Sequence, residues 1–139
     1  MRLKTINKAL ATRFDELDNL VEAQRIFEAV LHACIKASDA NLFVRLKRPD
    51  IENVLMSGGI PEGHDYRQIS DEMDEKYFDA EDEGRTDDAF YYFTLARLMS
   101  ALSFAAEATK VSDFSEATYE AMMSLPDPQT TADEIGVGI

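Results

Sequence analysis

Apolar residues recur at every third or fourth position along most of the chain, which is the spacing of one face of an α-helix. The first stripe of this kind consists of Leu3, Ile6, Leu10, Phe14 and Leu17. A second stripe follows Asn19, which together with Glu22 resembles a helix-capping pair. We therefore predict helices at residues 3–17 and 20–37, with one long bent helix as the alternative.

The segment from residue 39 to 47 is less periodic. Its centre, at residues 42–44, has strand-like composition, but no other segment offers a partner strand, so a short helix is the better interpretation. Pro49 then suits the first position of another short helix, because a backbone N–H at that position has no partner within the helix. The Gly58-Gly59 pair is expected to end that helix.

A strongly charged segment follows a loop at residues 60–63. Asp65 and Gln68 form a second capping pattern, and apolar residues follow at helical spacing. These features predict a fourth helix from about residue 65 to Ala80, with Gly84 marking its exit.

The following segment has the opposite character, because residues 89–106 carry a single charge, at Arg97. Its length approaches that of a membrane span, but Arg97 and several hydroxyl-bearing side chains favour a helix buried in a globular core. We predict a helix at 87–110, capped by Thr86 and central to the fold. Its expected core residues are Leu95, Leu98, Met99 and Leu102.

The capping pattern occurs once more at Asp113 and Glu116, before a last helix that we expect to end at Leu125 because prolines follow it. Residues 126–139 are then a flexible C-terminal tail. The sequence thus predicts an all-α fold, a single-domain bundle of about five to seven helices over residues 1–125.

Length and composition agree with one globular domain. The chain has 139 residues, of which 45% are hydrophobic, enough for a sizeable core. Its single cysteine, Cys34, lies among apolar residues, so we expect a buried thiol and no intramolecular disulfide. The start, MRLKTINKAL, lacks the apolar centre of a secretion signal, and we expect a cytoplasmic protein that does not bind membranes.

Negative charge is concentrated in one region. The net charge is −13 at pH 7, and residues 65–88 contain eleven Asp or Glu against Arg67, Lys76 and Arg85. Such a surface repels nucleic acid and anionic membranes, but it attracts basic proteins and speeds their encounter. The alternative interpretation is that these charges only keep the protein soluble.

We predict that this acidic segment binds a basic protein partner. The candidate residues are Asp71, Glu72, Asp74, Glu75, Asp79, Glu81, Asp82 and Glu83. On a nucleic-acid-binding partner their carboxylates would stand in for phosphate groups and exclude the true substrate. This hypothesis describes an interaction protein rather than an enzyme, with no cofactor, no metal and no nucleic acid.

Three of the same carboxylates suggest an alternative function. Glu72, Glu75 and Asp79 share one helical face, because residues three and four apart are neighbours on a helix. The pattern resembles the first magnesium-binding half of all-α nucleotide pyrophosphatases, whose second half lies on the next helix. That second half is missing from residues 87–110, which leaves a metal-dependent nucleotide hydrolase as the runner-up.

Two further patterns resemble known metal-binding motifs but differ from them at a key position. His64-Asp65, with His32 before it, resembles the HD-type phosphohydrolases, but the pair follows a loop, so helix capping by Asp65 is preferred. Residues 79–84 resemble a calcium loop whose twelfth position should be Glu and is Phe90.

Four consecutive aromatic residues at positions 90–93 cannot all face one core, because each helical step turns the chain by about 100°. Burial between helix layers accounts for most of them. The alternative is an interface patch beside the acidic segment, since Tyr and Phe are common anchors of protein interfaces.

Size, the acidic segment 71–83 and the Ala-rich stretch LARLMSALSFAAEA at 95–108 together resemble small acidic all-helical bacterial immunity proteins, which neutralise toxins. The resemblance implies an inhibitor that covers a basic partner such as a nuclease toxin. A third hypothesis is a structural or oligomerisation module, in which the basic amino-terminal helix of one chain meets the acidic segment of another.

Overall fold

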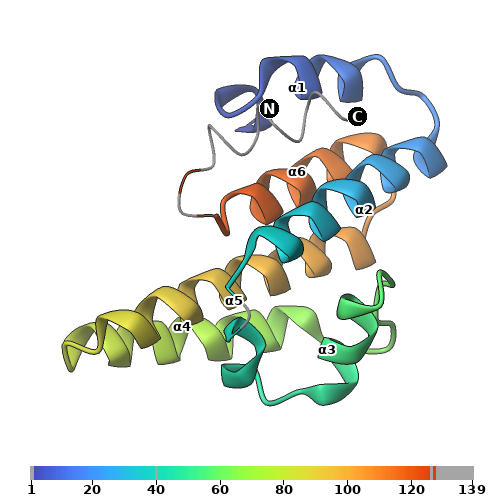
Figure 1. Cartoon of the computed structure of the whole chain (residues 1–139). Coiled ribbons are helices and arrows are strands. Elements are labelled where there is room, and N and C mark those ends of the chain that lie inside the picture. Colours follow the sequence, from blue (N-terminus) through green and yellow to red (C-terminus); the bar gives the residue numbers. More distant parts are fainter. Residues whose placement is uncertain (1, 40, 126, 128–139) are drawn as a thin grey trace.

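Every regular element of the computed structural model is a helix over residues 2–39, 41–125 and 127, which are the residues it describes (Figure 1). The α-helices are α1 (Lys8–Asp15), α2 (Leu20–Ala37), α3 (Pro49–Met56), α4 (Tyr66–Asp82), α5 (Thr86–Ala106) and α6 (Val111–Met122). Two short 3₁₀ helices are η1 (Arg2–Thr5) and η2 (Leu42–Arg45). The prediction of an all-α single-domain bundle is confirmed.

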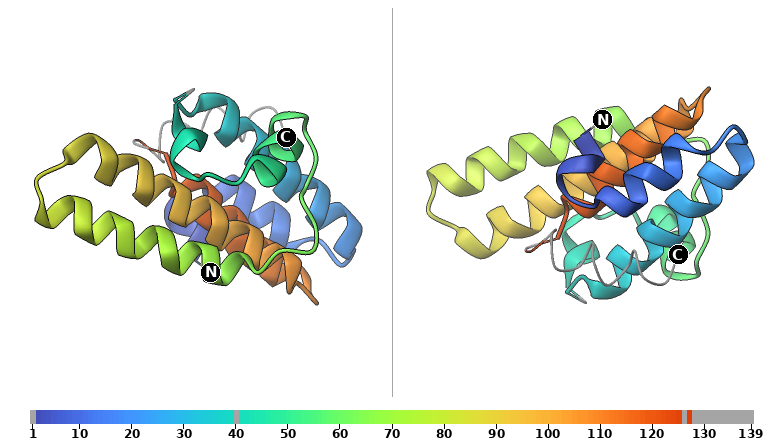
Figure 2. Two further views of the ribbon diagram at one scale, coloured as in Figure 1. Left: turned by 90° about the horizontal axis from the view of Figure 1, so that it is seen from below. Right: turned by 90° about the horizontal axis from the view of Figure 1, so that it is seen from above.

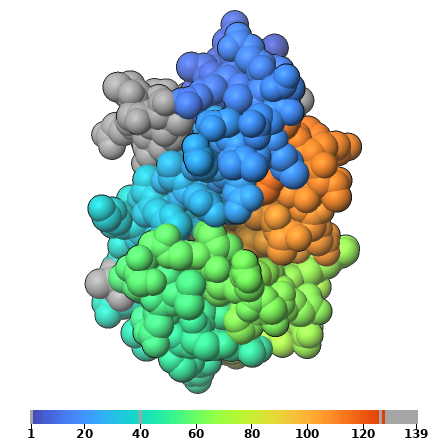
Figure 3. All heavy atoms as spheres, turned by 90° about the vertical axis from the view of Figure 1, so that its right-hand side faces the viewer, coloured from blue at the N-terminus to red at the C-terminus, as the bar shows by residue number. Residues whose placement is uncertain are grey.

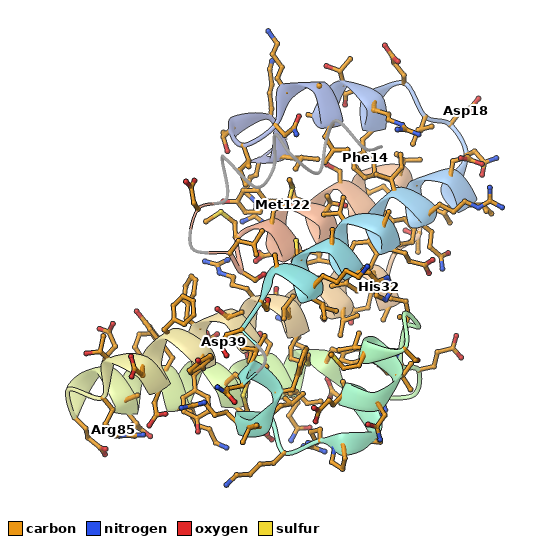
Figure 4. All side chains as sticks on the ribbon, in the orientation of Figure 1. Phe14, Asp18, His32, Asp39, Arg85 and Met122 are labelled. Carbon is orange, nitrogen blue, oxygen red and sulfur yellow. The ribbon has the colours of Figure 1, made fainter. Side chains whose placement is uncertain are left out.

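Helices α5 and α6 form the centre of the bundle. α6 packs against α1, α2 and α5, and α5 packs in turn against α4 (Figures 1 and 2). Figure 4 shows Phe14 between α1 and the layer that α2 and α6 form, where it is almost completely buried. The four core residues predicted for α5, Leu95, Leu98, Met99 and Leu102, are buried as expected.

The amino-terminal segment differs from the prediction. Helix α2 covers residues 20–37 as expected, and the Asn19 side chain caps it by accepting hydrogen bonds from the N–H groups of Val21 and Glu22. The single helix expected at 3–17 is instead η1 followed by α1. The Asn7 side chain accepts a bond from the Leu10 N–H, and its extended backbone, which is that of a helix N-cap, interrupts the helix.

The segment of uncertain periodicity is helical, as expected. η2 covers Leu42–Arg45, and α3 begins at Pro49 and ends just before the glycine pair. Gly58 has a positive φ of 90°, a conformation in which a side chain would be strained, so glycine suits this helix end.

The boundaries around α5 require corrections. Thr86 does not cap α5 but is its first residue, and α5 ends at Ala106 rather than at 110. Asp113 lies in the first turn of α6 and accepts hydrogen bonds from the N–H groups of Thr109 and Lys110. Those bonds draw the connecting residues out of α5 and let α6 begin at Val111.

Other ends shift by a few residues. α4 continues to Asp82, and α6 ends at Met122 rather than Leu125. The predicted tail at 126–139 lies outside the described residues, except for Asp127.

Cys34 is fully buried, and burial raises the pKa of its thiol to about 12. In the described part of the chain, no helix has both the length and the apolarity needed to span a lipid bilayer.

Candidate protein-binding arm

The acidic segment forms a helical hairpin that projects beyond the other helices (Figures 1 and 2). We call residues 66–93, which comprise α4 and the first part of α5, the acidic arm. Its turn is at Gly84, where φ is +72° and the N–H groups of Gly84 and Arg85 bond back to carbonyl groups of α4. Arg85 marks the far end of the arm in Figure 4.

Small side chains hold the two helices of the arm close together. Ala80 of α4 and Ala89 of α5 are buried between them. Nearer the body of the protein, the Ser70 hydroxyl donates to the Ala96 carbonyl over 2.9 Å. Close helix approach therefore gives the arm a defined shape without a large apolar core of its own.

The predicted partner-binding carboxylates lie on the outside of this arm. Seven of the eight are exposed to solvent, and Glu72 is half-buried, with its carboxylate 3.8 Å from the Arg48 guanidinium. Glu83 pairs with Arg85 over 2.7 Å, and Glu81 accepts a hydrogen bond from the Tyr77 hydroxyl over 3.1 Å.

Several of the other carboxylates have no internal cation. Among the described residues, no basic side chain lies within ion-pair distance of Asp71, Glu75 or Asp79. These three carboxylates are exposed to solvent.

One side of the acidic arm contacts η2 through Arg45. The Arg45 guanidinium donates to Asp88 over 2.8 Å and lies 4.1 Å above the Tyr91 ring. Hydrogen bonds from Arg45 and then Arg85 hold the pKa of Asp88 below its usual range. These contacts connect the arm to the body through cations of this chain.

Asp74 is the candidate carboxylate with a raised pKa. The residue is exposed as a whole, but its carboxylate is partly dehydrated, and this loss of hydration is the largest cause of the raised pKa. Arg97 acts in the opposite direction, while the like charges of Asp71 and Glu120 raise the pKa further. The folded protein thus resists ionisation of this group.

We expect Asp74→Asn to stabilise the protein at neutral pH. A carboxylate with a raised pKa in the folded state binds its proton more tightly there than in the unfolded chain, so the wild-type protein loses stability as the pH rises through that range. The gain should therefore disappear at acidic pH, where Asp74 is protonated in both states. Urea unfolding of the wild type and of Asp74→Asn from pH 3 to pH 7 measures this gain in the free energy of unfolding. Asp79→Asn is the control. An equal gain in the control would attribute the effect to the total charge of the arm instead.

The metal-site alternatives are not assembled in the structure. In the part of the chain that is described, no three His, Cys, Asp or Glu side chains are grouped so as to hold an ion, and this includes Glu72, Glu75 and Asp79. The expected capping role of Asp65 is confirmed, because its carboxylate accepts the Gln68 N–H at the start of α4.

The two histidines of the HD-like pattern have separate contacts. The ring nitrogens of His32 lie 2.8 Å and 3.1 Å from the carbonyl oxygens of Glu28 and Gly59, and His64 lies 3.5 Å from Asp50. Through these contacts His32 links α2 to the α3–α4 connection, and His64 links that connection to α3.

Aromatic side chains accompany the carboxylates on the arm. Of the run at 90–93, Phe90 is 42% exposed and the other three are half-buried, so none is a fully buried core residue. Phe78 is 62% exposed, and sequence reasoning missed it. The available signal was the Tyr77-Phe78 pair, since adjacent helical residues point about 100° apart and cannot both face α5.

An open groove lies between the two helices near the end of the arm. Its volume is about 470 Å³. The lining residues are Tyr77, Ala80, Glu81, Gly84, Thr86, Ala89, Phe90 and Phe93. The groove thus combines aromatic walls with one carboxylate, which is the combination found at many protein interfaces.

A second hollow lies where α2, the α3–α4 connection and the end of α5 meet, on the face shown in Figure 3. Its volume is about 400 Å³, and its lining is mixed: the apolar Phe27 and Leu102 lie beside the polar Glu28, Glu62 and His64.

No protein-family model matches the sequence, and comparison with curated proteins and with solved structures found no significant match either.

Proposed function

We propose that this protein is a non-enzymatic interaction protein that docks a basic protein partner on its acidic arm, in the manner of immunity-type inhibitors. The observation that supports this most directly is the projection of the arm, with seven of the eight candidate carboxylates exposed on it. Asp71, Glu75 and Asp79 form no ion pair with a basic side chain among the described residues, which would leave them able to contact cations of another molecule.

Charge favours a basic partner over a second copy of this chain. Two acidic arms brought together would repel each other, whereas a basic surface is attracted from a distance. The oligomerisation hypothesis needs the basic amino-terminal residues for contacts between chains. Arg2, however, already pairs within the chain, with its Nε 2.8 Å from Glu116 and its Nη2 3.3 Å from Glu120.

The mechanism of such an inhibitor is occlusion. The arm would lie across the phosphate-binding surface of a nuclease or another nucleic-acid-binding protein, with its carboxylates in place of phosphates. A hairpin of two packed helices would lose little conformational freedom on docking, which reduces the entropic cost of binding.

The test is the rate of association with a partner, obtained from a neighbouring gene or by affinity capture from the native cell extract. Replacing Glu72, Glu75, Glu81 and Glu83 with Gln should slow association by about tenfold or more at low salt. The difference should shrink as salt screens the charges. The fold should remain intact, because most of these side chains are exposed.

A matched control removes the same number of charges elsewhere, at the exposed residues Asp15, Glu16, Asp18 and Glu62. It should change the association rate much less, because these residues lie outside the arm. Equal rates for the wild type and the arm variant at every salt concentration would show that the arm is merely a solvated surface.

A further inference from the structure

We propose that the groove at the end of the acidic arm binds one face of a basic amphipathic helix of the partner. This inference rests on the proposed function, since it names the element of the partner that the arm recognises. The groove, not the acidic surface in general, would then determine which basic protein is bound.

The aromatic walls of the groove provide the apolar anchor site. The rings of Tyr77 and Phe93 have centroids 5.7 Å apart, one from each helix of the arm. Phe90 lines the same groove and remains 42% exposed, while Ala80 and Ala89, also in the lining, are nearly or fully buried. Covering the exposed part of Phe90 would remove apolar surface from water, which is the main driving force of association.

A helix suits this groove better than an extended peptide. An extended segment gains affinity by pairing with an open sheet edge, and the described residues contain no strand that could supply one. A groove between two helices instead accepts a third helix, whose apolar residues at i, i+3, i+4 and i+7 enter it in turn.

The apolar surface continues beyond this groove. Phe90 also lines a neighbouring hollow of about 360 Å³, together with Leu42, Tyr91, Thr94 and Leu125. The two hollows share Phe90, so a docked helix could extend from the end of the arm toward the end of α6 with more than one turn in contact.

The flanking charges specify that the helix is basic. Glu81 lines the groove itself, and the exposed Asp82 follows it. Asp87 is exposed at the start of α5. Lys or Arg residues on either side of an apolar stripe would meet these carboxylates, whereas the same groove of a second copy would bring like charges together.

A labelled peptide of 18 residues tests the proposal, with Leu at helical i, i+3, i+4 and i+7 spacing and Lys at most other positions. The control peptide has the same composition in scrambled order, so charge is equal and the apolar stripe is lost. Fluorescence anisotropy with the full-length protein should show at least tenfold tighter binding of the striped peptide.

Phe90→Ser should reduce affinity for the striped peptide about tenfold and leave the scrambled peptide unaffected. The matched control is Phe78→Ser, which removes a more exposed phenylalanine that does not line the groove, and it should change the affinity less than about twofold. Melting curves verify that both variants are folded. Should Phe90→Ser fail to fold, Glu81→Lys, at an exposed residue, should weaken binding of the striped peptide in the same way.

The outcomes separate the two proposals. Equal, salt-sensitive binding of both peptides would overturn the groove proposal and leave the acidic interaction surface standing. No binding of either peptide at low salt would contradict both. A wild-type protein that sediments as a dimer and becomes a monomer on Phe90→Ser would show that a second copy occupies the groove, which also overturns this inference.

Discussion

Replacing Leu98 with alanine is expected to lower the free energy of unfolding by about 2–5 kcal/mol. Leu98 is 1% exposed in α5, and it belongs to the main hydrophobic core. Truncation removes buried methyl groups and leaves a cavity, because the packed neighbours can relax only in part. For a domain of this size the melting temperature should fall by roughly 10 °C, which calorimetry or circular dichroism measures.

Phe104→Ala on the same helix serves as the control. Phe104 is 38% exposed, so its truncation leaves no closed cavity and should cost much less than that of Leu98. Comparable losses at the two positions would mean that burial in α5 does not determine the stability of the bundle.

Long, strongly periodic segments were predicted well from sequence. Residues 20–37 have both an apolar stripe and an Asn19 cap, and helix α2 has those bounds. The prediction of one helix at 3–17 was wrong around Asn7. The apolar stripe continues on both sides of Asn7, so periodicity alone does not reveal that its side chain caps a new helix. Local hydrogen bonding outweighed the periodic pattern there.

The capping pattern at Asp113 illustrates a second limit. An Asp followed three residues later by Glu can stand before a helix or lie within its first turn, and both positions place the carboxylate near free N–H groups. The structure has the second arrangement, with Asp113 accepting from Thr109 and Lys110. The end of α5 and the start of α6 were therefore each misplaced by a few residues.

The exposure of the acidic residues was predictable, but the projecting arm was not. α5 has 21 residues and α6 has 12, so at about 1.5 Å per residue α5 is roughly 13 Å longer. Its first part extends past α6 and lies beside α4 (Figures 1 and 2), with η2 contacting it through Arg45. A difference in helix length produces a projecting arm only where the two helices pack side by side, and the sequence does not show which helices are neighbours.

The buried carboxylate of Glu120 is another feature that sequence reasoning missed. Its side chain is 7% exposed, and it accepts a hydrogen bond from Arg97 over 2.7 Å and lies 3.3 Å from Arg2. A single Glu in α6 carries no sequence signal of this role, because its two cations lie far away in the sequence. The network joins α5, α6 and the amino terminus at the base of the acidic arm.

We expect Arg97→Met to lower the free energy of unfolding by about 3 kcal/mol, because it leaves the Glu120 carboxylate buried beside a single, more exposed cation. The methionine replaces most of the aliphatic stem of arginine, so the loss reports the missing charge rather than missing volume. Chemical denaturation at pH 7 gives the value.

The matched control is Arg25→Met, because Arg25 also pairs with a glutamate, Glu22, over 3.2 Å but is 71% exposed. An exposed pair contributes about 0–1 kcal/mol, so this variant should differ little from the wild type. The double variant Arg97→Met/Glu120→Met should recover much of the loss, because it removes the buried charge together with its partner. If the double variant is no more stable than Arg97→Met alone, the cost arises from packing around Arg97, and the ion pair with Glu120 does not hold α5 and α6 together.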